Sequence, residues 1–229
     1  MIELHTFTFN AFGEQSYLLD HGNGDATVVD PGMSNSVERE EFAFFCESKA
    51  LRITQMLLTH AHLDHVLGAA WITEKWGVHP LVHPLDRSTY EAAPRSAMVY
   101  GVPMDPLPAA DFSLEHGQTL NCGNQQLSVR FCPGHAPGHV VFVCEAHQFV
   151  LGGDVLFKGS VGRTDLPGCN PGDLVKSIET QLFSLPDDFV VWPGHGPSTT
   201  IAEEKSGNPF VNRSKTGMMQ QSDYSDFAD

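Results

Sequence analysis

Hydrophobic and polar positions alternate along several short stretches of this chain, with the period of two that is typical of half-buried strands. Residues 2–9 show this alternation. The segments 17–19 and 26–29 flank a turn at residues 21–25 that is rich in glycine and asparagine, which predicts a hairpin. A continuous apolar run at residues 53–58 predicts a buried strand. The N-terminal part is therefore expected to form a sheet.

Apolar positions that recur every three to four residues predict helices in three segments. These segments are 36–50, 66–76 and 172–185, and Gly77 is expected to end the second. Further strands are predicted at residues 80–83, 127–131, 140–143, 148–151 and 189–192. Strands and helices therefore alternate through most of the chain.

The segment 84–110 interrupts this pattern. It contains five prolines and reads as a long, partly irregular insertion. Two interpretations stay open: the insertion forms one wall of a cleft, or it is a peripheral flap without a role. Residues 1–213 are predicted to form one domain, and the polar segment 214–229 is predicted to be a disordered tail.

The charge of the chain limits its partners. A net charge of -15 over 229 residues, without a cluster of Lys or Arg, argues against nucleic acid and against an anionic membrane surface. A small anionic substrate is still compatible, because a bound metal and a few local cations can reverse the sign of the charge inside a cleft.

The cysteines and the chain start indicate a compartment. The five cysteines are odd in number and form no CxxC pair, which is typical of reduced intracellular thiols. The first residues lack the basic and apolar regions of a signal peptide, and no apolar run is long enough to span a membrane. We therefore expect a cytoplasmic protein.

Metal-binding side chains are concentrated in one run, Thr59–His65. His60, His62, Asp64 and His65 lie on the predicted turn between the strand 53–58 and the following helix. Loops at the ends of rigid elements are common positions for functional sites. Imidazole and carboxylate ligands suit Zn, Fe and Mn, so this run predicts a metal site.

Later strands end in further ligand types. His135 lies in a Pro-Gly-His-Ala-Pro-Gly-His stretch, Asp154 follows two glycines, and His195 is flanked by glycines. Glycine lets the backbone turn sharply beside a bulky ion. Because each strand end delivers one ligand, we expect these side chains to meet at one edge of the sheet scaffold.

The order His-x-His-x-Asp-His, then a histidine, an aspartate and a histidine, resembles the metallo-β-lactamase superfamily. The resemblance spans roughly residues 1–213 and implies an α+β fold, an αββα sandwich of two mixed β-sheets with helices on the outer faces. It also implies two divalent transition-metal ions, with zinc favoured and iron or manganese as alternatives. The implied ligands are His60, His62 and His135 for the first metal, Asp64, His65 and His195 for the second, and Asp154 as a bridge between them.

The closer likeness is to glyoxalase II, the hydroxyacylglutathione hydrolases, in a short bacterial form. It rests on the stretches 133–139, 153–157, 162–165 and 194–197. Only 34 residues follow His195, so we expect the helical C-terminal domain of long members to be missing.

The likeness to glyoxalase II implies hydrolysis of S-acylglutathione, such as S-D-lactoylglutathione, to glutathione and a hydroxy acid by a metal-bound hydroxide. Asp64 and Asp154 are the implied catalytic residues, acting as metal ligands. The implied partner is a small-molecule thioester, and the sequence leaves the oligomeric state open.

Four other residues have more than one interpretation each. Lys158 and Arg163 either bind a substrate carboxylate or are solvated surface charges. His139 supports a ligand, is structural, or is itself a ligand, and Asp30 either hydrogen-bonds to the ligand loops or belongs to an ordinary turn.

Rival functions share the same motifs. A mononuclear-iron glutathione persulfide dioxygenase would use His60, His135 and Asp154. A lactonase on the same fold is a second alternative, and a metal-dependent regulatory protein without turnover is a third. A secreted β-lactamase is disfavoured by the expected lack of an export signal.

Overall fold

The computed structural model describes residues 2–211. Its first sheet has five strands in the order β1-β2-β3-β4-β5. The strands are β1 (Glu3–Phe9), β2 (Glu14–Asp20), β3 (Asp25–Val29), β4 (Arg52–Leu57) and β5 (Pro80–Leu81). The first three are antiparallel, whereas β3, β4 and β5 run parallel, so the sheet is mixed.

The second sheet has six strands in the order β13-β12-β9-β8-β7-β6. The strands are β6 (Thr119–Cys122), β7 (Gln125–Phe131), β8 (Val140–Cys144), β9 (Phe149–Gly153), β12 (Val190–Pro193) and β13 (Thr199–Thr200). Only β9 and β12 pair in parallel, which makes this sheet mixed as well. A small hairpin of β10 (Leu156–Phe157) and β11 (Ser160–Val161) lies beside it.

The strands alternate their side chains between two cores. In β2, Tyr17 and Leu19 belong to the cluster between the two sheets, whereas Leu18 packs into the cluster on the outer face of the first sheet. In β8, Phe142 faces the inter-sheet cluster and Val141 the outer one. Because successive side chains of a strand point to opposite faces, a sheet covered on both faces needs apolar residues at both.

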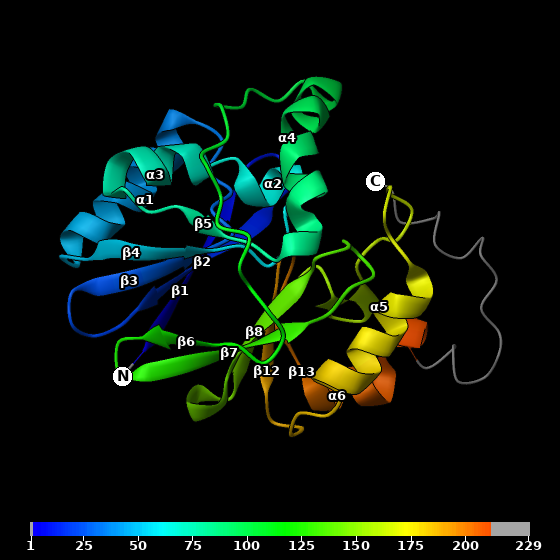
Figure 1. Ribbon diagram of the computed structural model, residues 1–229. Coiled ribbons are helices and arrows are strands. Elements are labelled where there is room, and N and C mark those ends of the chain that lie inside the picture. The colour runs from blue at the N-terminus through cyan, green and yellow to red at the C-terminus, as the bar shows by residue number, and fades with distance from the viewer. Residues whose placement is uncertain (1, 212–229) are drawn as a thin grey trace.

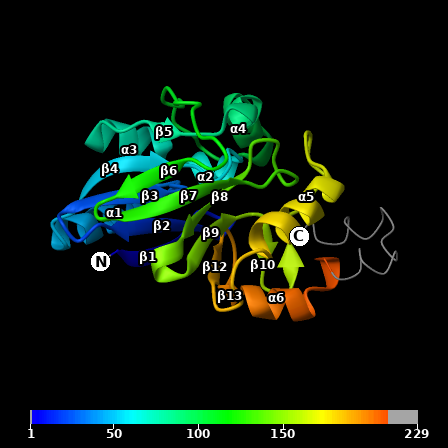
Figure 2. The ribbon, with the colours of Figure 1, turned by 60° about the horizontal axis from the view of Figure 1, so that its bottom comes forward.

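Helices cover the two outer faces (Figure 1). α1 (Ser36–Ser48) and α3 (Ala69–Trp76) pack on the first sheet. α5 (Pro171–Ser177), continued by a wider turn at Ile178–Leu182, and α6 (Ile201–Gly207) pack on the second, as Figure 2 also shows. The predicted αββα sandwich is therefore confirmed.

The helix predicted at residues 66–76 is interrupted. A short helix, α2 (Leu63–Val66), precedes α3, and the break falls at Gly68. The Gly68 amide donates to the carbonyl of Pro31 at 2.7 Å, and a side chain at this position would collide with Met33. The loop that follows β3 therefore crosses the chain here, a long-range contact that periodicity does not reveal.

The insertion 84–110 is more regular than its prolines indicate. It contains α4 (Arg87–Tyr100), a 14-residue helix with Pro94 in its interior, whereas residues 102–110 have no regular structure. Tyr90 and Ala93 are buried against the loop that carries the metal-binding run. This packing outweighs the loss of one backbone hydrogen bond at proline.

Two predictions concern the ends and the surroundings of the chain. The predicted tail, 214–229, lies outside the described residues, and the assignment of residues 1–213 to one domain stays a prediction. Within residues 2–211, no helix is both long enough and apolar enough to cross a membrane.

Candidate metal centre

The carboxyl ends of four strands meet at one edge of the sandwich. β4 leads into Thr59–His65, β7 into the loop 132–139, β9 into Asp154 and β12 into His195. This edge brings the predicted ligands into two groups of three, with Asp154 between them. The first group is His60, His62 and His135, and the second is Asp64, His65 and His195. Within each group the potential ligand atoms lie within 4.8 Å of one another.

Hydrogen bonds fix which nitrogen of His60 and of His135 faces the first group. The Thr59 hydroxyl donates to a buried carboxylate, so its oxygen accepts from Nδ1 of His60 at 3.1 Å. The carbonyl of Arg163 accepts from Nδ1 of His135 at 2.9 Å. Both Nε2 atoms therefore present lone pairs, yet they lie 3.2 Å apart, and His62 Nδ1 lies 2.8 Å from His135 Nε2. Converging lone pairs repel one another unless a cation lies between them.

The second group is oriented in the same way. Nδ1 of His65 donates to Asp30 at 3.1 Å, and Nδ1 of His195 donates to the carbonyl of Phe12 at 3.2 Å. Their Nε2 atoms point inward and lie 3.5 Å and 3.0 Å from the carboxylate of Asp64. His65 Nε2 is buried and has no hydrogen-bond partner.

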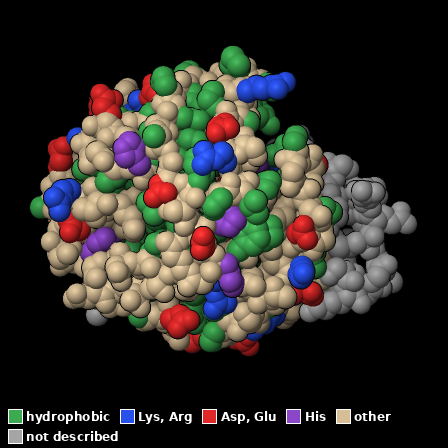
Figure 3. Space-filling view, viewed as in Figure 1, with side chains coloured by type: hydrophobic (Ala, Val, Ile, Leu, Met, Phe, Trp, Pro, Cys, Tyr) green, Lys and Arg blue, Asp and Glu red, His purple; other side chains and the backbone are tan. Residues whose placement is uncertain are grey.

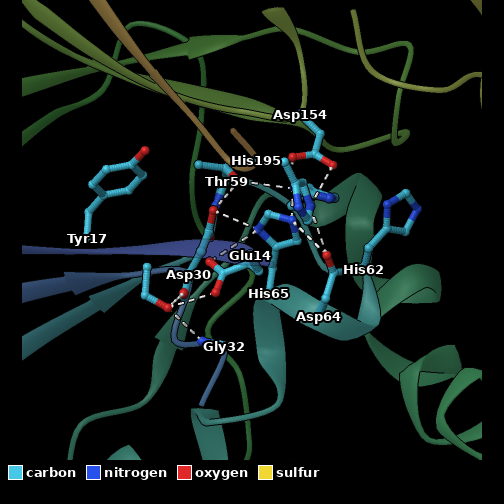
Figure 4. A network of polar contacts seen from close by, with 12 residues as sticks. Glu14, Tyr17, Asp30, Gly32, Thr59, His62, Asp64, His65, Asp154 and His195 are labelled. Carbon is cyan, nitrogen blue, oxygen red and sulfur yellow. Dashed lines mark hydrogen bonds and ion pairs between the residues drawn. The ribbon is translucent and has the colours of Figure 1, made fainter. Parts of the chain in front are cut away.

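Asp154 connects the two groups (Figure 4). Its Oδ1 lies 3.5 Å from Nε2 of His65, and its Oδ2 lies 3.5 Å and 3.6 Å from Nε2 of His135 and His195. Oδ1 is buried without a hydrogen-bond partner. An orphaned carboxylate oxygen and an orphaned imidazole nitrogen that point into one space fit a bound cation, and this donor set suits divalent transition metals. The individual ligand roles stay a prediction.

The two groups differ in their electrostatics. Burial and neighbouring histidines lower the pKa of His60 far below its usual value and that of His62 to about 3. Burial also lowers the pKa of His65 and His195, but the carboxylates of Asp64 and Asp154 outweigh it and raise both pKa values. Without a cation, the second group therefore attracts protons, whereas the first group keeps its lone pairs free.

Asp30 supports both the turn and the second group. Its carboxylate accepts from the amide and the hydroxyl of Thr59 at 2.7 Å and 2.6 Å, and from His65. Asp30 adopts a left-handed backbone conformation with a φ of 50°, which is strained for residues other than glycine. Of the two interpretations of Asp30, the structure supports the contact with the ligand loops.

His139 stands behind the ligands and belongs to neither group. Its Nε2 accepts a hydrogen bond from the backbone amide of Asp154 at 3.0 Å, and its ring stacks on that of His60 with centroids 4.7 Å apart. The residue is fully buried. His139 therefore orients two predicted ligands, which is the supporting role among its interpretations.

Asp86 is a supporting residue that the sequence did not reveal. It is fully buried at the start of α4, and its carboxylate accepts from the amides of Ala61 at 2.6 Å and Gly138 at 3.0 Å and from the Thr89 hydroxyl at 3.2 Å. Burial raises the pKa of Asp86, opposed by these donors. One carboxylate thus ties together the loops on which the first group lies. No local motif signals it, because its partners are distant in sequence.

Glu14 is a second buried acid that the sequence did not reveal. Its Oε2 accepts from the Ser16 hydroxyl at 2.9 Å, and its Oε1 lies 3.9 Å from Nδ1 of His65. Burial raises the pKa of Glu14 well above its usual value. It lies at the start of β2 beside His65 and is not among the residues that line the cleft over the centre.

An open cleft of about 1150 Å³ lies over the centre. One wall is the face of α4 that carries small side chains such as Ala92 and Ser96. The exposed rings of Tyr100 and Phe12 meet edge to face on the cleft lining, with centroids 5.6 Å apart. Of the two interpretations of the insertion, the structure supports the cleft wall.

The two predicted substrate-binding residues are placed differently. Arg163 lines the cleft, but its guanidinium is bound to Asp165 through two hydrogen bonds of 2.7 Å and 2.8 Å. Lys158 is exposed on the turn between β10 and β11 and is not among the residues that line the cleft. On the face shown in Figure 3, Lys and Arg side chains are scattered among Asp and Glu and form no continuous basic patch.

Comparison with known proteins identifies the family. Residues 10–195 match the model of the Metallo-beta-lactamase superfamily. The chain belongs to this superfamily. The matched residues include all seven predicted ligands.

Relatives of this metallo-beta-lactamase superfamily member include a protein named as a hydrolase and two proteins of solved structure. The hydroxyacylglutathione hydrolase GloC of Haemophilus influenzae is 36% identical over 205 residues, which cover 88% of this chain and 94% of that protein. A crystal structure of TTHA1623 in a di-iron-bound form is 39% identical, with a TM-score of 0.81 over 90% of this chain and 99% of that one. The BLEG-1 B3 metallo-beta-lactamase is 30% identical, with a TM-score of 0.83 over 91% and 99%.

Proposed function

We propose that this chain is a metal-dependent thioesterase that hydrolyses S-acylglutathione, such as S-D-lactoylglutathione, to glutathione and a hydroxy acid. The observation that carries the proposal is the pair of three-residue groups joined by Asp154 beneath an open cleft. The similarity to a protein named hydroxyacylglutathione hydrolase supports the choice of substrate.

The ligand residues have distinct tasks in this proposal. Divalent metals bound there would supply Lewis acidity and lower the pKa of water. The first group offers lone pairs that are already free at neutral pH, because the pKa values of His60 and His62 are lowered. Asp64 and Asp154 are the proposed catalytic carboxylates. Asp64 lies beside His195 in the second group, and Asp154 lies between the two groups, near His65 and His135.

The identity of the metals is part of the proposal. Imidazole and carboxylate donors suit zinc, and a related protein has been crystallised in a di-iron-bound form. We propose two divalent ions, with zinc favoured and iron or manganese as alternatives. Metal analysis of protein purified without chelators measures both identity and number.

We propose that the protein acts in the cytoplasm and that its partner is a small-molecule thioester. We propose neither a nucleic acid nor a membrane as a binding partner. All five cysteines are free, as is usual in a reducing compartment. The scattered cations on the described face in Figure 3 support the absence of a nucleic-acid partner.

A substrate panel on metal-loaded protein tests the function. Thioester loss from S-D-lactoylglutathione, followed by absorbance, should be faster than hydrolysis of a penicillin, a lactone or a cyclic nucleotide. Asp154→Ala should abolish it, whereas Asp187→Ala, at an exposed ion pair with Lys205 (2.6 Å), should not.

An oxygen electrode run with glutathione persulfide tests the dioxygenase alternative in parallel. Oxygen uptake without thioester turnover would overturn the proposal in favour of the dioxygenase. Faster turnover of a lactone than of the thioester would favour the lactonase.

A further inference from the structure

Arg163 has a special position in the cleft. Among the described residues that line the cleft, it is the only lysine or arginine. Its backbone carbonyl accepts from Nδ1 of His135 at 2.9 Å, so the start of its side chain is fixed relative to the first ligand group. The side chain of Arg163 therefore begins beside the first ligand group, and its guanidinium can hold an anionic part of a substrate whose reacting carbonyl lies at the centre.

The guanidinium is already engaged by a carboxylate of the chain itself. Nε and Nη2 of Arg163 donate to the two oxygens of Asp165 at 2.7 Å and 2.8 Å. This two-point arrangement is also the geometry with which a guanidinium binds a substrate carboxylate. Asp165 itself is not among the cleft-lining residues, so it holds Arg163 from outside the cleft.

The ion pair is weak enough to be exchanged. The side chains of Arg163 and Asp165 are 39% and 43% exposed, and ion pairs of this kind contribute little because water and salt screen them. A carboxylate that enters the cleft can therefore replace Asp165, but it loses part of its binding free energy in doing so. A neutral substrate has no such competitor.

We propose that Asp165 is a specificity-determining residue that competes with the anionic arm of the substrate for Arg163. The inference rests on the proposed thioesterase function and adds to it the charge preference of the cleft. Asp165 reduces the preference for anionic thioesters. The protein therefore discriminates less between anionic and neutral acyl thioesters than it would if Arg163 were not paired with Asp165.

The test uses the metal-loaded protein and two thioesters with the same acyl group. One is S-D-lactoylglutathione, which is anionic, and the other is the D-lactoyl thioester of N-acetylcysteamine, which is neutral. Asp165→Asn should lower KM for the anionic thioester by up to about five-fold, the strength of an exposed ion pair, and leave the neutral one unchanged. Asp165→Ser should act in the same direction, and the double variant with Arg163→Ala should remove the gain.

Asp25→Asn is the matched control. Asp25 pairs with Arg52 at 2.8 Å, and the two residues begin β3 and β4. The metal centre lies at the opposite end of these strands. The control removes the same charge from an exposed aspartate–arginine pair, so a fall in KM in this variant too would mean that only net charge matters. An equal effect of Asp165→Asn on both thioesters would overturn the inference. A rise in KM for the anionic thioester would also overturn it, because it would mean that Asp165 holds Arg163 in its binding position.

A binding measurement separates this inference from the proposed function. Titration calorimetry with S-methylglutathione, which cannot be hydrolysed, should give a lower Kd for Asp165→Asn than for the unmodified protein. If no thioester is turned over but this Kd falls, the proposed function fails and the role of Asp165 stands. If thioesters are turned over but neither Kd nor KM changes, the role of Asp165 fails and the function stands.

Discussion

Replacing Asp86 by alanine should destabilise the fold, because its carboxylate satisfies two buried backbone amides. The amides of Ala61 and Gly138 donate to it at 2.6 Å and 3.0 Å, and water cannot replace it readily at a residue with no exposed surface. Each orphaned buried donor costs about 1–3 kcal/mol, so the loss in unfolding free energy should be about 4 kcal/mol. For a chain of this size, that loss lowers Tm by about 8–16 °C.

The same change should weaken metal binding. Ala61 lies between His60 and His62, and Gly138 lies three residues after His135, so the carboxylate of Asp86 sets the spacing of all three ligands of the first group. Loss of a residue that supports metal ligands typically lowers metal affinity about 10–100-fold. Competition with a chromophoric chelator measures the affinity, and thermal unfolding of the metal-free protein followed by circular dichroism measures the stability.

Two further variants make this reasoning refutable. Asp187→Ala removes an exposed aspartate and should change Tm little, because its ion pair with Lys205 is exposed. Gly138→Ala should resemble Asp86→Ala, because a side chain at Gly138 would collide with the backbone of Asp86. Equal Tm values for Asp86→Ala and Asp187→Ala, together with unchanged chelator competition, would refute the role given to Asp86.

Three other predictions concern the metals and the substrate. Asp154→Ala should lose at least one equivalent of metal by elemental analysis, and an unchanged metal content would contradict the proposed bridging position of Asp154. Acid should release metal in two steps, because protons compete for the imidazole nitrogens most strongly where the pKa is raised, at His65 and His195, and least where it is lowered, to about 3 at His62. Loss of both metals in one step would contradict this order. Arg163→Ala should raise KM for S-D-lactoylglutathione several-fold with little change in kcat if the contact is uniform, and a fall in kcat alone would contradict it.

The meeting of the predicted ligands at one edge was predictable from sequence because each of them lies at a strand end. The run Thr59–His65 follows an apolar strand, and Asp154 and His195 follow glycines after later strands. The architecture brings strand ends to one edge, so knowing the strands was nearly enough to know that these side chains meet. Short apolar stretches also predicted most of the longer strands to within one or two residues, because strands that are covered on both faces are rich in apolar side chains.

The supporting residues were not predictable, because their partners lie far away in the sequence. Asp86 bonds to amides 25 and 52 residues away, and Glu14 lies near His65 only after β2 has joined the sheet. The helix α4 was missed for a related reason: Pro94 counts against a helix locally, whereas the burial of Tyr90 that stabilises it depends on the tertiary fold. Periodicity contains no information about such contacts.

His135 and His139 show why a ligand motif does not by itself assign ligands. They lie in the same Pro-Gly-His-Ala-Pro-Gly-His stretch and are both buried. Nδ1 of His135 donates to the carbonyl of Arg163, which leaves its Nε2 lone pair facing the centre, whereas Nε2 of His139 is already taken by the amide of Asp154. The backbone partner therefore decides which histidine can bind a metal and which one orients a predicted ligand. Those partners come from the residue after β9 and from the loop after β11, which only the folded chain brings to the site.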